Sequence, residues 1–450
     1  MLPVLTPEEM AAVDAAAPEP VDVLIGRAGA AIARAAVEML GGTYGRRVAV
    51  VAGRGNNGND GREAARRLAR RGVRATVIPA AEAPATLPDA DLVIDAAYGT
   101  GFRGEYRAPD PGGAPVLAVD VPSGVEGATG AAPGTPVVAE RTVTFAALKP
   151  GLVFHPGRGL AGEVALADIG LDVSRATTWV VEAADVGWWV PPRPADAHKW
   201  RSAVMVASGS PGMTGAASLV AAAAQRGGAG MVRVAVPGLD DPPLPTEAVG
   251  VAAPLAGWEI TVLDQLDRAG ALVVGPGLGR SAPAAAGVAR VVGEADLPLV
   301  IDGDGLTALD GQAVELLRQR SAATVLPPHD GEFARLAGEG PGPDRIGATR
   351  TLAAGTGAVV LLKGPTTVVA APDGRVRLSM SGDQRLATAG TGDVLTGLIG
   401  ALLACGAEAF DAAAAGAWLH GRAAMAGPAH GLVAGDLIDH LPDALAGVSG

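Results

Sequence analysis

Short runs of apolar residues alternate with segments of helical pattern along the 450-residue chain. The runs are continuously apolar, as expected of strands covered on both faces, and therefore predict parallel sheets. The predicted strands are Val48–Val51, Ala75–Ile78, Leu92–Ile94, Val116–Val119, Thr142–Phe145, Ala203–Ala207, Val232–Val236, Ala271–Val274, Leu299–Ile301, Ala323–Leu326 and Val359–Leu362. The predicted helices are Gly61–Arg71, Gly215–Gln225, Thr391–Ala404 and Asp411–Ala426. Together they predict an α/β fold.

A proline cluster near residue 190 divides the chain into two such series. The cluster, Pro191–Asp196, reads PPRPAD and follows Trp188 and Trp189. A second series of strands, loops and helices begins immediately afterwards. We interpret the cluster as a linker between a domain at 1–190 and a domain at 198–450. The alternative is a proline-rich surface loop inside one domain.

One uncharged segment is long enough to cross a bilayer. It runs from Ser202 to Gln225. The turn-rich stretch Ser208–Gly215 interrupts it, so we interpret it as a buried strand, a glycine loop and the start of a helix. The N-terminus has neither a basic region nor an apolar stretch, so we predict no signal peptide.

Composition and charge narrow the class of protein. Hydrophobic residues make up 49% of the chain and charged residues 18%, which excludes wholesale disorder. The net charge of −12 makes nucleic acid and acidic membrane surfaces poor general partners. Cys405 is the only cysteine, which excludes an intrachain disulfide and favours the cytoplasm. We expect a cytoplasmic enzyme that forms a homo-oligomer.

A glycine-rich loop joins the first predicted strand to a helix. Gly53–Gly61 reads GRGNNGNDG. Glycines let the backbone approach a phosphate, and a helix N-terminus offers free N–H groups to it. The paired amides Asn56 and Asn57 add side-chain carbonyls that could coordinate a hard cation or bind an amide-bearing ligand. The alternative is a tight turn with no ligand.

Two further strands of the first half end in carboxylates. Asp95 ends one strand, and Asp120 follows another, three residues before Ser123. Because the carboxyl ends of parallel strands share one edge of a sheet, these side chains and Asn57 could converge. For each aspartate alone, the commoner role is a helix cap or an Asx turn.

These motifs resemble the YjeF N-terminal domain, the NAD(P)H-hydrate epimerase family. The resemblance rests on NNGND, IDAAYGTGFRGE and DVPSGVEGATG, with Thr6–Met10 and Arg27–Gly29 before them, and covers residues 1–190. It implies a Rossmann-like three-layer domain that interconverts the R and S epimers of hydrated NAD(P)H. It also implies a K⁺ ion held by Asn57, Asp95 and Ser123, with Asp120 as the acid/base.

The same resemblance implies a set of contacts to the hydrated dinucleotide. They are Asn56, Asn57, Gly58, Asn59, Asp60, Gly99, Thr100, Gly101, Phe102, Arg103, Gly104 and Glu105. Asn59 departs from the family, which usually has glycine there. If the position needs a positive φ, asparagine is the least costly replacement.

In the second half, another glycine loop opens an apolar helix. Gly390 and Gly392 let the chain wrap an anion at a helix N-terminus. Asp393 either complements the helix dipole or acts as a general base on a substrate hydroxyl. Lys363–Thr367 follows a strand and offers a cation and hydroxyls to a phosphate or an adenine. A strand-end lysine is otherwise a surface charge.

Three more loops of this half follow apolar strands and therefore lie near the same edge. They are GPGLG at Gly275–Gly279, the segment Val300–Leu306, and Pro327–Phe333. His329 in the last of them could be a neutral donor to a ligand. A single histidine is more often a satisfied loop residue, but Glu332 and the neighbouring loops share its edge.

This set resembles the YjeF C-terminal domain, the NAD(P)H-hydrate dehydratase family, which has a ribokinase-like fold. GPGLG, VIDGDGL, PHDGEF, KGPTT and GTGDVLTG occur in the family order, within residues 198–446. The resemblance implies that ADP drives the reaction, giving AMP and phosphate, with Mg²⁺ bridging phosphates and carboxylates. Asp393 would deprotonate the hydrate hydroxyl for phosphorylation, and loss of phosphate would restore the double bond.

The resemblance also implies which residues contact the S-hydrate and which contact the nucleotide. Contacts to the S-hydrate would come from Ala216, Gly279, His329 and Asp393, and contacts to the nucleotide from Lys363, Gly364, Pro365, Thr366, Thr367 and Gly392. Departures from the family pattern are Trp200, the glycines of Asp302–Gly305, and Ser381–Leu386. A vitamin or sugar kinase and a non-catalytic N-terminal binding module are the alternatives. The pairing of PHDGEF with KGPTT and the fused first domain favour the dehydratase over the kinase.

Overall fold

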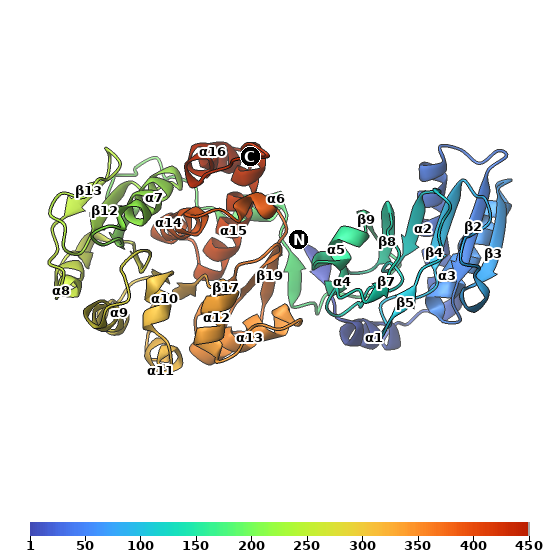
Figure 1. Cartoon of the computed structure of the whole chain (residues 1–450), viewed down its shortest axis with the longest axis horizontal. Helices are drawn as coiled ribbons and strands as arrows, with labels where there is room; N and C mark the ends of the chain where they lie inside the picture. The colour runs from blue at the N-terminus through green and yellow to red at the C-terminus, as the bar shows by residue number, and fades with distance from the viewer. Residues whose placement is uncertain (449–450) are drawn as a thin grey trace. The chain divides into compact units, whose positions relative to one another are not determined.

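The computed structural model describes residues 1–448 and divides into two compact units (Figure 1). One unit comprises Leu2–Thr178, and the other begins at Trp179 and includes Met1. The division falls before the proline cluster at 191–196, so helix α6 (Ala183–Trp189) belongs to the second unit. Among the helices within residues 1–448, none has the length and hydrophobicity needed to cross a membrane.

The first unit is built on a parallel sheet with strand order β3-β2-β4-β6-β8-β9. Its strands are β2 (Arg47–Ala52), β3 (Arg74–Pro79), β4 (Leu92–Ala96), β6 (Val116–Val119), β8 (Arg141–Phe145) and β9 (Glu163–Ala167). All five strands predicted in this half are present. The edge strand β9 was not predicted, because the apolar run in its sequence EVALA is only four residues long and half of it is alanine.

Helices α2 (Val21–Leu40) and α3 (Asn56–Ala69) pack together on one face of this sheet. Between them and the strands lies a core of Val, Leu, Ile and Ala. A smaller cluster, which includes Val51, Val93 and Leu87, covers the opposite face. The remaining elements are β1 (Leu2–Val4), α1 (Pro7–Ala15), η1 (Ala80–Glu82), β5 (Tyr106–Arg107), β7 (Gly134–Thr135), α4 (Pro150–Val153) and α5 (Gly157–Leu160).

The second unit has a larger sheet with the order β10-β19-β18-β17-β16-β15-β14-β11-β12-β13. The pairs from β17 to β13 are parallel, and β17, β18 and β19 form antiparallel pairs. Its strands are β10 (Thr178–Val180), β11 (Ala203–Ala207), β12 (Met231–Ala235), β13 (Val249–Val251), β14 (Ala271–Val274), β15 (Leu299–Ile301), β16 (Thr324–Leu326), β17 (Val359–Leu362), β18 (Thr367–Ala370) and β19 (Val376–Ser379). All six strands predicted here are present, with ends within one residue.

Helices cover this sheet. One group packs with alternate strand residues in a continuous core and comprises α7 (Thr214–Arg226), α14 (Thr391–Ala404), α15 (Ala409–Ala426) and α16 (Ala434–Ala446). The others are α8 (Trp258–Leu263), η2 (Leu266–Arg268), α9 (Ala282–Glu294), α10 (Asp304–Ala308), α11 (Ala313–Arg318), α12 (Asp330–Ala337), α13 (Arg345–Thr356) and η3 (Gln384–Leu386). The uncharged segment Ser202–Gln225 forms β11, a loop and α7, as predicted.

In each sheet, successive strands are added first toward one edge and then, from a switch point, toward the other edge. In the first unit this point lies between β2 and β4, and in the second between β11 and β14. Loops that leave such neighbouring strands part in opposite directions and open a crevice at the carboxyl ends. The predicted motifs follow β2, β4 and β6 in one unit and β11, β14, β15, β16 and β17 in the other.

Candidate active sites

In the first unit, the loop after β2 is shorter than its sequence suggests, because α3 already begins at Asn56. Close packing explains two of its glycines. A Cβ atom at Gly58 would overlap the carbonyl oxygen of Gly53, and one at Gly53 would overlap that of Ala97. Asn59 lies inside α3 and has no positive φ. The departure at position 59 therefore needs no left-handed backbone.

Three predicted cation ligands converge beside this loop. Ser123 Oγ donates to Asp95 Oδ1 at 2.7 Å, and Ser123 N donates to Asp95 Oδ2 at 2.8 Å. Asn57 Nδ2 donates to the carbonyl oxygen of Tyr98 at 2.9 Å, and the same carbonyl lies 3.2 Å from Ser123 Oγ. Oxygens of Asn57, Asp95, Tyr98 and Ser123 thus meet between β4, β6 and α3.

One oxygen of this cluster has no partner. Asn57 Oδ1 is buried and accepts no hydrogen bond. Burial raises the pKa of Asp95 to about 6, although hydrogen bonds from Ser123 and Ala97 oppose this rise. A bound cation would satisfy the free amide oxygen and would favour the ionised carboxylate. The donor set therefore fits a monovalent cation that binds oxygen.

Asp120 stands directly after β6 in a strained backbone conformation. Its φ of +68° lies in the left-handed region, which non-glycine residues seldom occupy. Asp120 Oδ2 accepts from Thr100 N at 2.9 Å, and Oδ1 lies 2.7 Å from Lys149 Nζ. Lys149 is 1% exposed and also donates to Thr144 Oγ1 at 2.9 Å. Asp120 is thus fixed on one side by a buried cation and on the other by the 99–105 loop.

A pocket of about 470 Å³ opens beside Asp120. Its lining includes eight of the predicted residues, namely Asn56, Asn57, Asp60, Gly99, Thr100, Gly101, Phe102 and Asp120. The other predicted contacts, Gly58, Asn59, Arg103, Gly104 and Glu105, are not among its lining residues. Arg103 is exposed and pairs with Glu8 at 3.4 Å.

Lys149 is one residue of this site that the sequence analysis missed, as is Tyr98, whose carbonyl lies in the cation cluster. The chain has only three lysines, Lys149, Lys199 and Lys363, against many arginines. Two of these three lie in the candidate sites, so the rarity of lysine was a usable signal.

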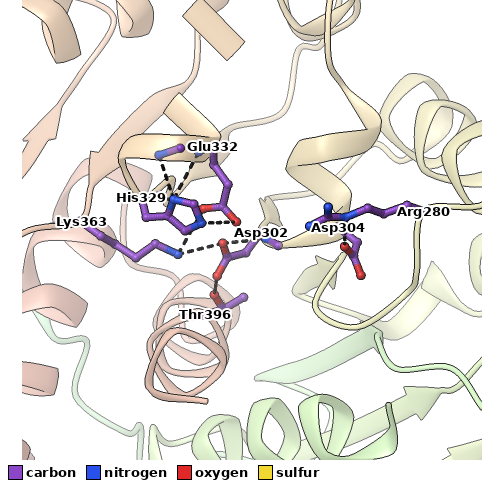
Figure 2. A network of polar contacts seen from close by, with 9 residues as sticks. Arg280, Asp302, Asp304, His329, Glu332, Lys363 and Thr396 are labelled. Carbon is purple, nitrogen blue, oxygen red and sulfur yellow. Dashed lines mark hydrogen bonds and ion pairs between the residues drawn. The ribbon is translucent and has the colours of Figure 1, made fainter. Parts of the chain in front are cut away.

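In the second unit, a polar network centres on Asp302, at the carboxyl end of β15 (Figure 2). Asp302 is 3% exposed. Its Oδ1 accepts from Lys363 Nζ at 3.1 Å, and its Oδ2 accepts from Thr396 Oγ1 at 2.5 Å. Lys363 Nζ also lies 3.7 Å from Glu332 Oε2. The network joins the ends of β15 and β17 to the starts of α12 and α14.

His329 caps α12. Its Nδ1 accepts from the backbone N–H groups of Gly331 at 3.0 Å and Glu332 at 3.3 Å, while Glu332 Oε2 accepts from His329 N at 2.9 Å. Because Nδ1 is an acceptor, the neutral ring carries its proton on Nε2. Its Nε2 lies 3.5 Å from Glu332 Oε1, and the side chain is 58% exposed, so the ring is held beside Glu332 at the surface of the site.

Asp393 lies in the first turn of α14, whose N-cap Gly390 has a φ of +87°. Burial and repulsion from Asp302 raise the pKa of Asp393 to about 6, against an opposing effect of Lys363. For Lys363, burial favours the neutral amine, but attraction to Asp302 and Glu332 outweighs it and raises the pKa. The site thus holds a cation beside a carboxyl that titrates close to neutral pH.

The remaining predicted contacts lie at the starts of α7 and α14 and on loops that follow strands of the same sheet. Ala216 is in the first turn of α7, and a Cβ atom at Gly277 would lie 3.0 Å from its Cβ. Gly279 N donates to Asp304 Oδ2 at 2.9 Å. Gly364, Pro365, Thr366 and Thr367 form the turn from β17 into β18, and a Cβ atom at Gly392 would lie 3.6 Å from Lys363 Nζ.

The departures from the family pattern have local explanations. Gly303 has a φ of +58°, a backbone conformation that glycine adopts without strain. Arg385 pairs with Asp383 at 2.9 Å and fixes η3. The ring of Trp200 lies 5.3 Å from the guanidinium of Arg268.

Family models match both halves of the chain. Residues 204–446 match the model described as NAD(P)H-hydrate dehydratase. Residues 21–87 and 78–151 match the model described as the YjeF-related protein N-terminus.

Similar proteins were found among curated sequences and solved structures. The chain is 40% identical over 420 residues to the bifunctional NAD(P)H-hydrate repair enzyme Nnr of Mycobacterium tuberculosis, covering 85% of this chain and 84% of that one. It is 39% identical to the Mycobacterium leprae enzyme of the same name, covering 95% of each. A crystal structure of the ADP/ATP-dependent NAD(P)H-hydrate dehydratase from Bacillus subtilis, co-crystallised with ATP and Mg²⁺ and soaked with CoA, is similar at 29% identity. It covers 59% of this chain and 97% of that chain, with a TM-score of 0.51.

Proposed function

The chain belongs to the family of bifunctional NAD(P)H-hydrate repair enzymes, and we propose that its two activities reside in the two sites described above. The pocket beside Asp120 carries the epimerase activity, and the Asp302 network with Asp393 carries the dehydratase activity. We propose the epimerase domain at 1–190 and the dehydratase domain at 198–450, with residues 179–190 belonging to the second compact unit.

In the epimerase pocket, Asp120 is the group that moves a proton. The observation that carries this assignment is its contact with Lys149 at 2.7 Å, in a pocket that would take the nicotinamide end of the substrate. The buried lysine compensates the carboxylate charge, and Thr100 N orients the second oxygen. Asp120 is thereby fixed in position as an acid/base for the hydroxyl-bearing carbon.

K⁺ is the cation proposed for the neighbouring cluster. Asn57, Asp95 and Ser123 would hold it, with the free Oδ1 of Asn57 as the most direct support. A bound ion would fix the loop after β2 against the loop after β4, both of which line the pocket. Epimerisation is expected to slow when Na⁺ replaces K⁺, whereas an unchanged rate would contradict this role.

In the dehydratase site, the substrate hydroxyl is phosphorylated by ADP and the phosphate is then eliminated, giving AMP and phosphate. Asp393 accepts the hydroxyl proton, since a carboxyl with a pKa of about 6 is largely ionised at neutral pH and remains basic. Lys363 and the turn to Thr367 contact the nucleotide phosphates. Asp302 and Glu332 supply the carboxylate oxygens that Mg²⁺ prefers, and the ion would neutralise phosphate charge there.

The experiment that tests both assignments follows the recovery of reduced-nicotinamide absorbance from a mixture of R- and S-hydrate, with ADP, ATP or no nucleotide. Complete recovery with ADP is expected from both activities together. Recovery that stops near half would mean an inactive epimerase site. No recovery with either nucleotide would contradict the dehydratase assignment and favour a kinase of small hydroxylated compounds.

A further inference from the structure

The epimerase pocket contains a second carboxyl, that of Asp60, which takes no part in the proton transfer assigned to Asp120. Asp60 projects from α3, is 8% exposed and lines the same pocket as Asp120. Among residues 1–448 the structure gives its carboxyl no hydrogen-bond donor and no ion-pair partner. A buried carboxyl without a partner is costly to ionise, so its retention in a ligand pocket calls for an explanation.

The charges that surround Asp60 and Asp120 differ in sign. Asp120 contacts the ammonium of Lys149 at 2.7 Å and Thr100 N at 2.9 Å. Within residues 1–448, no lysine or arginine forms an ion pair with Asp60. Burial, together with repulsion from Asp120 and Asp14, raises the pKa of Asp60 to about 8. One carboxyl of the pocket is therefore ion-paired while the other retains its proton at neutral pH.

We propose that Asp60 is the general acid that works together with the Asp120 carboxylate in epimerisation. Two carboxyls in contrasting environments within one pocket commonly take opposite roles in proton transfer. This inference rests on the proposed assignment of the pocket to the epimerase reaction. It gives Asp60 a chemical task in addition to contacting the dinucleotide.

The first half of the reaction removes the hydroxyl. Water adds to an enamine with its oxygen on the carbon next to nitrogen, so the epimeric carbon of the hydrate is bonded to the ring nitrogen. Asp60 donates its proton to the hydroxyl and the carbon–oxygen bond breaks. Water leaves while the nitrogen lone pair forms a carbon–nitrogen double bond.

The second half rebuilds the hydroxyl on the other face of the same carbon. Water adds, the double-bond electrons return to nitrogen, and Asp120 takes the proton that the water releases. In the reverse direction Asp120 is the acid and Asp60 the base. Between forward turnovers, the proton passes from Asp120 back to Asp60 through solvent.

The test is the steady-state epimerisation rate of Asp60→Asn in the full chain. Asparagine keeps the shape and polarity of the side chain but cannot donate an acidic proton. We expect kcat to fall about 10²–10⁴-fold, the usual contribution of a general acid, with KM changed less than about threefold. Asp89→Asn, an exposed carboxylate of the same unit, is the matched control and keeps the wild-type rate. Dehydration of pure S-hydrate by the same sample confirms that the chain is folded.

Two further readouts separate proton donation from a structural role. The wild-type kcat is expected to fall above about pH 8 as Asp60 loses its proton, and this limb disappears in Asp60→Asn. Added formate restores part of the rate to Asp60→Ala, because a small acid can enter the vacated space.

The inference is overturned if Asp60→Asn retains a rate within threefold of wild type. It is also overturned if the rate falls but the alkaline limb persists and formate has no effect. Asp120→Asn distinguishes this failure from failure of the site itself. Loss of epimerisation in Asp120→Asn alone removes only the role of Asp60, whereas normal epimerisation in Asp120→Asn removes the assignment of the pocket.

Discussion

The two sites contain the same pair of side chains in different surroundings. Asp120 contacts Lys149 at 2.7 Å in the first unit, and Asp302 contacts Lys363 at 3.1 Å in the second. In each unit the aspartate stands at the carboxyl end of a central parallel strand. The Lys149 side chain is 2% exposed, whereas that of Lys363 is 23% exposed. The first lysine is a sealed counter-charge, and the second can reach an anionic ligand.

Each site also contains a second carboxyl in addition to its aspartate–lysine pair. Asp60 in the first unit and Asp393 in the second both have raised pKa values, of about 8 and about 6. Attraction to Lys363 opposes the rise at Asp393, whereas no cation opposes it at Asp60. The pKa of the second carboxyl is therefore higher where no lysine opposes the rise, so Asp60 is suited to donate a proton and Asp393 to accept one.

Among the variants that test this comparison, Asp393→Asn is expected to have the largest effect on a rate. Removal of the general base should lower the dehydration rate about 10²–10⁴-fold, while ADP still binds and epimerisation continues. Turnover of S-hydrate and calorimetric titration with ADP measure the two effects. Asp373→Asn, an exposed residue of the same unit, is the control. Normal dehydration by Asp393→Asn would remove the assigned base.

Replacing the lysines tests whether one is sealed and the other accessible. Lys149→Met leaves Asp120 buried without a cation and should destabilise the first unit by about 3–5 kcal/mol. Lys363→Met should destabilise the second unit less, because 23% of the lysine side chain is exposed and water can enter beside Asp302 once the ammonium is gone. Hydrogen exchange in urea, followed separately for β6 and β15, gives both values. An equal loss at both positions would contradict the distinction.

A smaller effect concerns the pH dependence of dehydration. The rate is expected to rise through about pH 6 as Asp393 becomes ionised. In Asp302→Asn one repulsive charge is gone, so the pKa of Asp393 falls and the acid limb moves to lower pH. Single-turnover rates between pH 4 and 8 measure the shift. A limb that stays in place would mean that another group titrates.

The pH dependence of stability gives a further test of the unpaired carboxyl at Asp60. Because the pKa of Asp60 is raised on folding, the native state binds more protons than the unfolded state between its ordinary pKa of 3.8 and about 8. Stability therefore falls as pH rises through this window. Asp60→Asn should melt at a higher temperature than wild type at pH 8, and at the same temperature below pH 3.8. A lower melting temperature at pH 8 would contradict the unpaired state of this carboxyl.

The strands and the motif loops could be predicted from the sequence because they depend on local patterns. Buried parallel strands are continuous apolar runs, and all eleven predicted ones are present. The start of α3 was placed five residues late, because NNGND at 56–60 is typical of loops although these residues are helical. The pair β18 and β19 was missed, since its strands are short and antiparallel.

The parts of the sites that could not be predicted depend on contacts distant in sequence. Lys149 meets Asp120 only because β8 lies beside β6, and Thr396 meets Asp302 only because α14 packs on β15. His329 was predicted as a ligand donor, whereas its use of Nδ1 as a helix cap follows from backbone geometry. The environment that sets the charge of Asp60 likewise exists only in the folded chain.

The most direct test compares wild type with Asp120→Asn. It follows the time course of NADH recovery, in the presence of ADP, from equal amounts of R- and S-hydrate. Asparagine tolerates the positive φ at position 120, so the loop should keep its fold. Wild type is expected to recover all of the NADH at the dehydratase rate. Asp120→Asn is expected to recover about half at that rate and the rest only as fast as the epimers interconvert spontaneously. Complete recovery at the wild-type rate by Asp120→Asn would contradict the assignment of epimerisation to this pocket.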